Sequence, residues 1–157
     1  MRRLSGYPEW FYQVTITMLA GLLMSAVLLI PNTLEMRLDV DVPIHVTGNY
    51  RLFGAVVHSL TGFLSMGLLG ALIPLHIRLG WRRRINRFSG CTLLIIFALL
   101  LFSAIGIYYI GNPDLSRFVS LFHTLVGLTL ILFFIWHSVQ GQRIRAQARH
   151  QVGISQP

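Results

Sequence analysis

Four of the six histidines in the chain lie in long apolar segments or at their ends: His58, His76, His123 and His137. The first two share one segment and the last two share another. Ionisable residues inside apolar segments are costly, so they usually mark a functional site. Neutral imidazole is a common axial ligand of haem iron, and it also serves in proton relays. A relay would need carboxylates nearby, and the apolar segments contain none.

The spacing of these histidines places each pair on one face of a helix. His123 and His137 are 14 residues apart, which leaves the rings about 40° apart around the helix and about 21 Å apart along it. His58 and His76 are 18 residues apart, which closes about five turns over about 27 Å. If both segments run from outside to inside, each surface receives one histidine from each segment. Two facing pairs at two depths could clamp two planar macrocycles.

The two intervals differ by four residues, or about 6 Å of helical rise. The second segment must therefore tilt or bend to bring His76 level with His137, and Pro74 offers a place for a bend. If it does neither, His76 is an interfacial residue and only an outer haem forms. His45, in the loop outside, is then the spare candidate ligand.

Glycines and arginines near the histidines fit the same interpretation. Gly62 and Gly127 follow the outer histidines in the words "HSLTG" and "HTLVG", where a missing side chain would leave room for a porphyrin edge. An arginine lies six or seven residues from each histidine, toward the nearer surface, where it could pair with haem propionates. Small-residue packing would also explain the glycines, and the charge bias of membrane loops would explain the inner arginines. The arginines are Arg51 and Arg117 on the outer side and Arg82 and Arg143 on the inner side.

Four apolar segments, at about 11–30, 53–75, 90–110 and 118–139, carry or surround these residues. Each is about 20 residues long, enough for a helix to cross about 30 Å of hydrocarbon. Hydrophobic residues make up 54% of the chain and charged residues only 11%. The sequence therefore predicts an all-α membrane protein, a bundle of four transmembrane helices in a single domain over 1–157.

The charge of the chain is strongly positive, with 13 basic residues, all of them arginine, against 5 acidic ones. Ten of the arginines precede the first segment, separate the second from the third, or follow the fourth. This bias predicts that both termini are cytoplasmic and that the protein lies in a bacterial inner membrane. Because the charges lie in short runs between apolar segments, membrane lipid is a better partner than nucleic acid. The lone Cys91 excludes an intrachain disulfide, and the lack of a Cys-x-x-Cys-His motif predicts non-covalent haem.

Residues 36–42, in the outer loop between the first two segments, alternate apolar and charged side chains. This pattern predicts a short periplasmic strand-like loop that stops at Pro43. Such a strand would either cover the outer end of the bundle or serve as a docking edge for a periplasmic partner.

Residues 50–142 resemble the small membrane b-type cytochromes of the cytochrome b561-like and related di-haem group. The resemblance lies in the four-helix layout, the histidines on the second and fourth helices, and the words "WRRRINRFSG" and "SAIGIYYIG" at the ends of the third. It implies two haem b groups, transmembrane electron transfer and the four histidines as axial ligands. The 18-residue interval departs from the 14-residue spacing typical of that group.

The leading functional hypothesis is electron transfer between a quinone pool and a periplasmic redox protein, such as a c-type cytochrome or a dehydrogenase. The chain has no flavin or nicotinamide motif, so it would be the membrane subunit of a larger oxidoreductase or respiratory complex. Two alternatives remain open. One is a cofactor-free scaffold subunit of a membrane complex, and the other is a pigment-binding, antenna-like protein. A visible spectrum separates the three.

Overall fold

The computed structural model describes residues 7–44, 46 and 48–154. Within these ranges the protein is all-α, and four helices are long and apolar enough to cross a membrane. The prediction of four helices long and apolar enough to cross a membrane is confirmed, and these helices suggest a multi-pass membrane protein. The elements are α1 (Glu9–Leu38), α2 (Gly48–Leu72), a π-helix (Ile73–Ile77), α3 (Arg78–Arg82), α4 (Arg87–Tyr109) and α5 (Pro113–Ile154).

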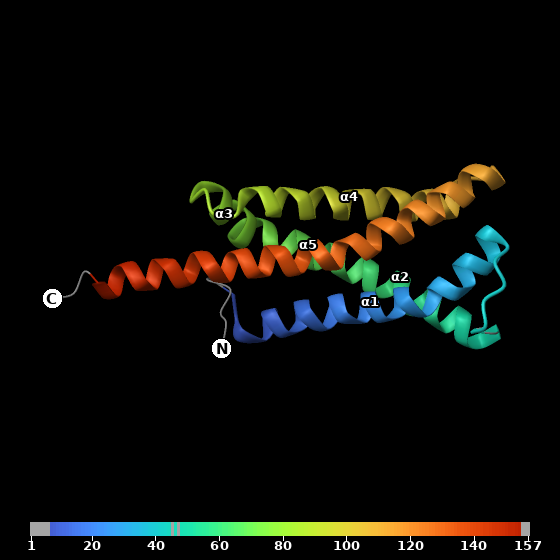
Figure 1. Cartoon of the computed structure of the whole chain (residues 1–157), viewed down its shortest axis with the longest axis horizontal. Helices are drawn as coiled ribbons and strands as arrows, with labels where there is room; N and C mark the ends of the chain where they lie inside the picture. Colours follow the sequence, from blue (N-terminus) through green and yellow to red (C-terminus); the bar gives the residue numbers. More distant parts are fainter. Residues whose placement is uncertain (1–6, 45, 47, 155–157) are drawn as a thin grey trace.

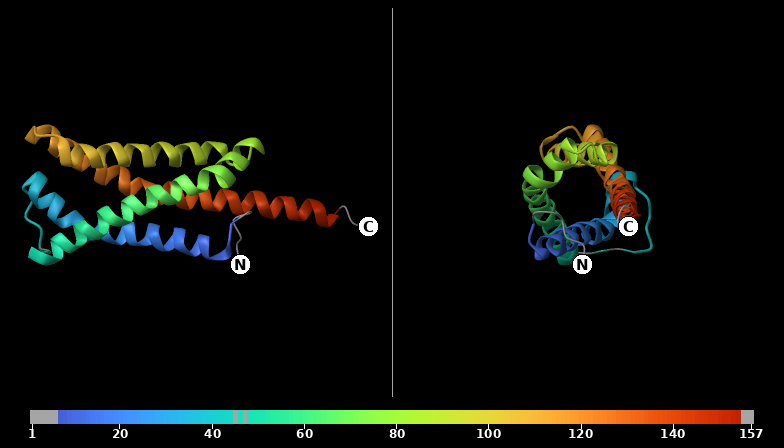
Figure 2. Two further views of the ribbon diagram at one scale, coloured as in Figure 1. Left: turned by 180° about the vertical axis from the view of Figure 1, so that it is seen from behind. Right: turned by 90° about the vertical axis from the view of Figure 1, so that its left-hand side faces the viewer.

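The four long helices form two antiparallel pairs, α1 with α2 and α4 with α5, and α1 also contacts α5. Seen end on, the order around the bundle is α1, α2, α4, α5, so α2 and α5 lie diagonally opposite each other (Figure 2). The start of α1 and the end of α5 lie at the same end of the bundle, and α5 extends beyond the other helices there (Figure 1). The two helices that carry the histidines therefore face each other across the centre.

The start of α5 shows how local sequence sets a helix boundary. The side-chain oxygen of Asn112 accepts a hydrogen bond from the backbone N–H of Leu115 at 3.0 Å, and its carbonyl accepts one from Ser116 at 2.9 Å. Pro113 and Asp114 follow at the first helical positions. A capping Asn, then Pro, then an acidic residue is typical of a helix N-terminus. The helix consequently begins five residues before the apolar segment predicted from residue 118.

The predicted strand-like loop at residues 36–42 is wrong. Helix α1 continues through Pro31 to Leu38 and ends at Asp39, which adopts a left-handed conformation with φ of 53°. Residues 40–44 are irregular, and the described part of the chain contains no strand. A strand must pair its backbone groups with a neighbouring strand, whereas a helix pairs them internally. In a bundle without a sheet the alternating pattern had no edge to join, so the strand-docking hypothesis falls with it.

The second apolar segment departs from a straight α-helix at the predicted place. A π-helix spans Ile73–Ile77 and contains Pro74. Proline has no backbone N–H, so one α-helical hydrogen bond cannot form there, and the wider π turn takes up an extra residue. Helix α2 is also clearly tilted against α4 (Figure 2). The predicted irregularity at Pro74 is confirmed as a π-helix, and the tilt of α2 accompanies it.

The buried apolar core lies midway along the bundle. It consists of Ile96, Phe97 and Leu100 from α4 and Leu130 from α5. Side chains from all four long helices pack around it, namely Leu19, Met66, Leu69, Leu93, Val126 and Phe133.

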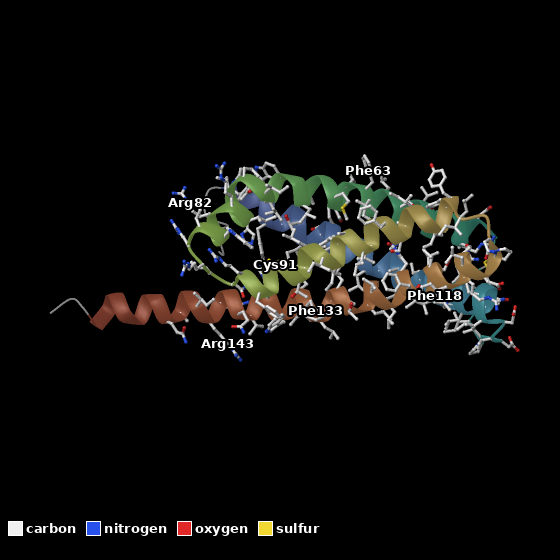
Figure 3. All side chains as sticks on the ribbon, turned by 90° about the horizontal axis from the view of Figure 1, so that it is seen from above. Phe63, Arg82, Cys91, Phe118, Phe133 and Arg143 are labelled. Carbon is white, nitrogen blue, oxygen red and sulfur yellow. The ribbon has the colours of Figure 1, made fainter. Side chains whose placement is uncertain are left out.

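Large apolar side chains cover the outside of the bundle. Phe63 on α2 is 77% exposed and Phe118 on α5 is 64% exposed, and Figure 3 shows Phe63 at one edge of the bundle. An apolar surface of this extent suits contact with lipid chains rather than water.

Replacing Gly106 by Val is expected to lower the free energy of unfolding by about 1–3 kcal/mol, because added atoms would overpack the contact between α4 and α5. A Cβ built on Gly106 would lie 3.0 Å from Val119 Cγ1 and 3.3 Å from Ile110 Cδ1. Thermal unfolding in detergent, followed by circular dichroism, measures the effect. The matched control is Gly67→Val, because a Cβ on Gly67 would meet no atom within 4 Å. Equal melting temperatures for the two variants would contradict the close approach at Gly106.

Candidate functional site

His58 on α2 and His123 on α5, the pair predicted to lie toward the outside and called the outer histidines, face each other across the bundle. Their ring centroids are 6.2 Å apart and their planes are 84° apart. Both side chains are partly buried. The expectation that these two residues meet, although 65 positions separate them in the sequence, is confirmed.

The inner histidines, His76 and His137, form a second pair of the same kind. Their ring centroids are 6.0 Å apart and their planes are 74° apart. His76 lies within the π-helix that contains Pro74. This irregular turn therefore holds the histidine that the helical spacing alone did not bring level with His137. The uneven spacing of the histidines is therefore compatible with two facing pairs.

The two pairs lie at different depths of the bundle. On α5, His123 and His137 are separated by 14 residues, or about 21 Å of helical rise. The side chains of the buried core, including Phe97 and Leu130, lie between these two levels. Cofactor sites in four-helix bundles are commonly built from side chains on facing helices, as here.

The distance between the rings fits a metal atom held between them. A metal–imidazole bond of about 2.0–2.1 Å and about 1.1 Å from nitrogen to ring centre, counted on both sides of the metal, give about 6 Å between centroids. The two observed distances are 6.2 and 6.0 Å. In the described part of the chain, no group of three or more His, Cys, Asp or Glu could hold a metal ion. Two protein ligands in apolar surroundings suit haem, because the porphyrin supplies the remaining four nitrogens.

Serine hydroxyls lie against the other ring nitrogen of both outer histidines. Ser25 Oγ on α1 is 3.2 Å from His58 Nδ1, and Ser103 Oγ on α4 is 2.8 Å from His123 Nδ1. Both serines are at least nine-tenths buried. Hydrogen bonds to the second nitrogen commonly orient histidine ligands in metal sites.

The inner histidine on α5 has a matching partner. Ser89 Oγ is 2.9 Å from His137 Nδ1, and Ser89 is 99% buried. Asn86, which precedes α4 in a left-handed conformation with φ of 53°, donates its amide hydrogen to the backbone oxygen of His137 at 3.0 Å. Asn86 Oδ1 also accepts a hydrogen bond from Ser89 at 2.5 Å.

Sequence reasoning missed these polar residues, although one signal pointed to them. Ser89 and Ser103 are 14 residues apart, the same interval as His123 and His137. In an antiparallel helix pair, equal intervals bring both serines level with both histidines in one register. Ser25 gives no comparable signal, because α1 carries no second serine matched to His76.

Gly62 and Gly127, which were predicted to leave room for a porphyrin edge, lie next to neighbouring helices. A Cβ on Gly62 would lie 3.7 Å from Leu22 Cδ1, and a Cβ on Gly127 would lie 3.8 Å from Leu100 Cδ2. These are ordinary van der Waals distances, so packing against α1 and α4 does not by itself require glycine. Their role beside a porphyrin remains a prediction.

The outer arginines have partners near the end of α1. Arg117 Nη2 lies 3.8 Å from the Asp39 carboxylate, and Arg51 donates a hydrogen bond to Met36 Sδ at 3.4 Å. Both bonds are exposed, and exposed pairs of this kind contribute only about 0–1 kcal/mol.

Two inner arginines, Arg82 and Arg143, lie at the same end of the bundle (Figure 3). Both side chains are exposed. The pairing of the four arginines with propionates stays a prediction. His45, the spare candidate ligand, lies outside the described residues.

One buried hydroxyl on the histidine face of α2 has no hydrogen-bond partner. Ser65 is 96% buried and its Oγ is unpaired, counting the residues that the structure describes. It follows His58 by seven residues, about two turns, so it lies on the same side of α2 and about 10 Å deeper. Leaving a buried hydroxyl without a hydrogen bond costs about 1–3 kcal/mol, so such groups are unusual inside a folded protein.

Comparisons with known proteins give this chain no relative. No family model, no curated protein and no solved structure matches it. The functional interpretation therefore depends on the residues of the two histidine pairs and on their geometry.

Proposed function

We propose that this protein binds two haem b groups and carries electrons across a membrane. The observation that carries the proposal is the pair of facing imidazoles found twice, at two depths, with ring centroids 6.2 and 6.0 Å apart. Rings that pack edge to face also have centroids about 4.5–7 Å apart, so the spacing alone does not separate haem ligation from ring packing. The proposal is supported by the repetition of the pair at two depths from the same two helices, which two haems with two imidazoles each would require.

The residues of this chain would have distinct roles in that function. Haem supplies one-electron redox chemistry when it is bound. His58 and His123 would be the axial ligands of the outer haem, and His76 and His137 those of the inner one. The surrounding apolar helices exclude water from the metal, which helps to set its potential. Arg51, Arg117, Arg82 and Arg143 would supply positive charge for the propionates.

The direction of the chain in the membrane follows from its arginines. Most of them lie at the end of the bundle where α1 begins and α5 ends, and this end is cytoplasmic under the positive-inside rule. Arg51 and Arg117 then face the periplasm of a bacterial inner membrane. The proposal agrees with the resemblance to small membrane b-type cytochromes of the b561-like group. It makes the chain an electron-transfer subunit that works with a quinone pool and a periplasmic c-type cytochrome or dehydrogenase.

Purified protein is expected to show a reducible b-type spectrum with about two haems per chain, because two histidine pairs are present. A pyridine haemochrome assay, normalised to amino-acid analysis, measures the ratio. The cells need an adequate haem supply, and an unrelated four-helix membrane protein from the same cells controls for adventitious haem. A chain without haem would overturn the proposal in favour of a scaffold subunit. A chlorophyll-type spectrum would favour the pigment-binding alternative.

A further inference from the structure

Three serine hydroxyls contact histidine Nδ1 atoms, and each of them already donates its hydrogen elsewhere. Ser103 Oγ donates to the backbone oxygen of Leu99 at 2.6 Å, with Leu100 O at 3.1 Å. A serine hydroxyl has one hydrogen and two lone pairs. Toward His123 Nδ1, at 2.8 Å, it can therefore offer only a lone pair. The hydrogen in that contact must belong to the histidine.

The same count holds for His58. Ser25 Oγ donates to the backbone oxygen of Gly21 at 2.8 Å, with Leu22 O at 3.0 Å. Its remaining lone pair faces His58 Nδ1 at 3.2 Å. Both outer rings are consequently in the form that carries hydrogen on Nδ1.

The inner ring differs, because two groups reach its Nδ1. Ser89 Oγ donates to Asn86 Oδ1 at 2.5 Å, so it offers a lone pair to His137 Nδ1 at 2.9 Å. The amide nitrogen of Asn86, which can only donate, lies 3.0 Å from His137 O and 3.3 Å from the same Nδ1. The first contact requires hydrogen on Nδ1 and the second requires a lone pair there, so the count assigns no tautomer to His137.

A neutral imidazole with hydrogen on Nδ1 keeps the lone pair of Nε2 available for a metal. We propose that Ser25 and Ser103 are positioning residues that hold His58 and His123 in this tautomer and set the basicity of these two ligands. The inference depends on the proposed haem function for its redox consequence, but the tautomer itself does not.

The chemistry of the acceptor gives the proposal its direction. Stronger acceptors at Nδ1–H make imidazole a more basic ligand, which favours oxidised iron. A neutral hydroxyl is a weaker acceptor than a carboxylate. Removing the hydroxyl is expected to make the ligand still less basic, favour the reduced iron and raise the potential.

The decisive experiment is a redox titration of the haem-loaded protein and its variants. Ser103→Ala is expected to raise the potential of one of the two haems while haem content stays unchanged. A tenfold change in the relative affinity for reduced and oxidised haem corresponds to about 59 mV for a one-electron couple. Ser25→Ala should raise the potential of the same haem, the other haem should keep its potential in both variants, and Ser103→Thr should retain the original value.

The matched control is Ser120→Ala. Ser120 is a buried serine on α5 whose hydroxyl donates to Ser116 O at 2.9 Å. Like Ser103, it donates a hydrogen bond to the backbone oxygen four residues earlier in its own helix. Unlike Ser103, the structure gives it no hydrogen bond to a histidine. If haem-loaded Ser103→Ala and Ser25→Ala have the same haem potentials as Ser120→Ala, the proposal is overturned.

A second measurement is independent of haem. Nitrogen-15 NMR of the full chain, labelled at histidine and purified from haem-limited cells, reports which ring nitrogen carries hydrogen. We expect Nδ1–H at His123, and a mixture of tautomers in Ser103→Ala. An Nε2–H tautomer in the parent chain would overturn the inference. Absence of haem from well-supplied cells would instead overturn the proposed function, so the two failures are distinguishable.

Discussion

Replacing His123 by Ala is expected to lower the haem content from about two to about one per chain, because iron held by two axial imidazoles loses half of its protein ligands. The partner ring, His58, lies 6.2 Å away across the bundle and cannot bind both faces of one iron. His58→Ala is expected to lose the same haem, since the two residues serve one site. Pyridine haemochrome assays on the two single variants and on the double variant measure the loss.

The double variant makes the test sharp. If His58 and His123 ligate one iron, the double variant retains about one haem, the same as each single variant. If they served separate irons, the double variant would retain none. The control is Leu125→Ala, two residues along α5, where the side chain is 63% exposed on the outside of the bundle. Unchanged haem in His123→Ala would show that this ring is not a ligand.

Insertion of these variants into the membrane is expected to be normal. The four helices remain long and apolar without the imidazoles, and neither orientation nor span length depends on one ring. The local cost of the His123 substitution falls on its hydrogen-bond partner, Ser103. In His123→Ala, the lone pair of Ser103 that faced the ring loses its donor, although the hydroxyl keeps its bond to Leu99. Correct membrane insertion and helical circular dichroism therefore separate loss of haem from loss of fold.

Inserting one alanine between Leu69 and Gly70 is expected to abolish the inner haem and leave the outer one. The π-helix Ile73–Ile77 already holds one residue more than an α-helical turn would, so it cannot take up a second one. The insertion into the regular part of α2 therefore moves His76 by about 1.5 Å and about 100° around the axis. Its ring then no longer points at His137, which lies 6.0 Å away in the intact protein. His58 lies about three turns before the insertion and keeps its place.

Two comparisons make this result interpretable. Ile73→Ala keeps the chain length and should retain both haems, because this side chain is 54% exposed on the outside of the bundle. His76→Ala and His137→Ala should each lose the same haem as the insertion, as judged from the remaining spectrum. If the insertion or His76→Ala keeps both haems, His76 is an interfacial residue and the inner ligand of that iron lies elsewhere.

The sequence by itself determined the four helices and the faces that carry the histidines. Helix length follows from apolar run length, and ring direction follows from a fixed rotation per residue, so both are local properties of the chain. The 14-residue interval between His123 and His137 was enough to place them on one face at two depths. The conflict between this interval and the 18 residues from His58 to His76 also correctly pointed to Pro74.

Only the tertiary structure decided how that conflict is resolved, by a π-helix together with the tilt of α2, because both depend on the helices packed beside it. It also overturned the strand at residues 36–42, since strand pairing needs a neighbour that one segment cannot reveal. The diagonal placement of α2 and α5, and the contact of Ser25 with His58 across 33 residues, are likewise set by packing between distant segments. Hydrogen-bond partners of this kind depend on the register and rotation of both helices, which no local pattern contains.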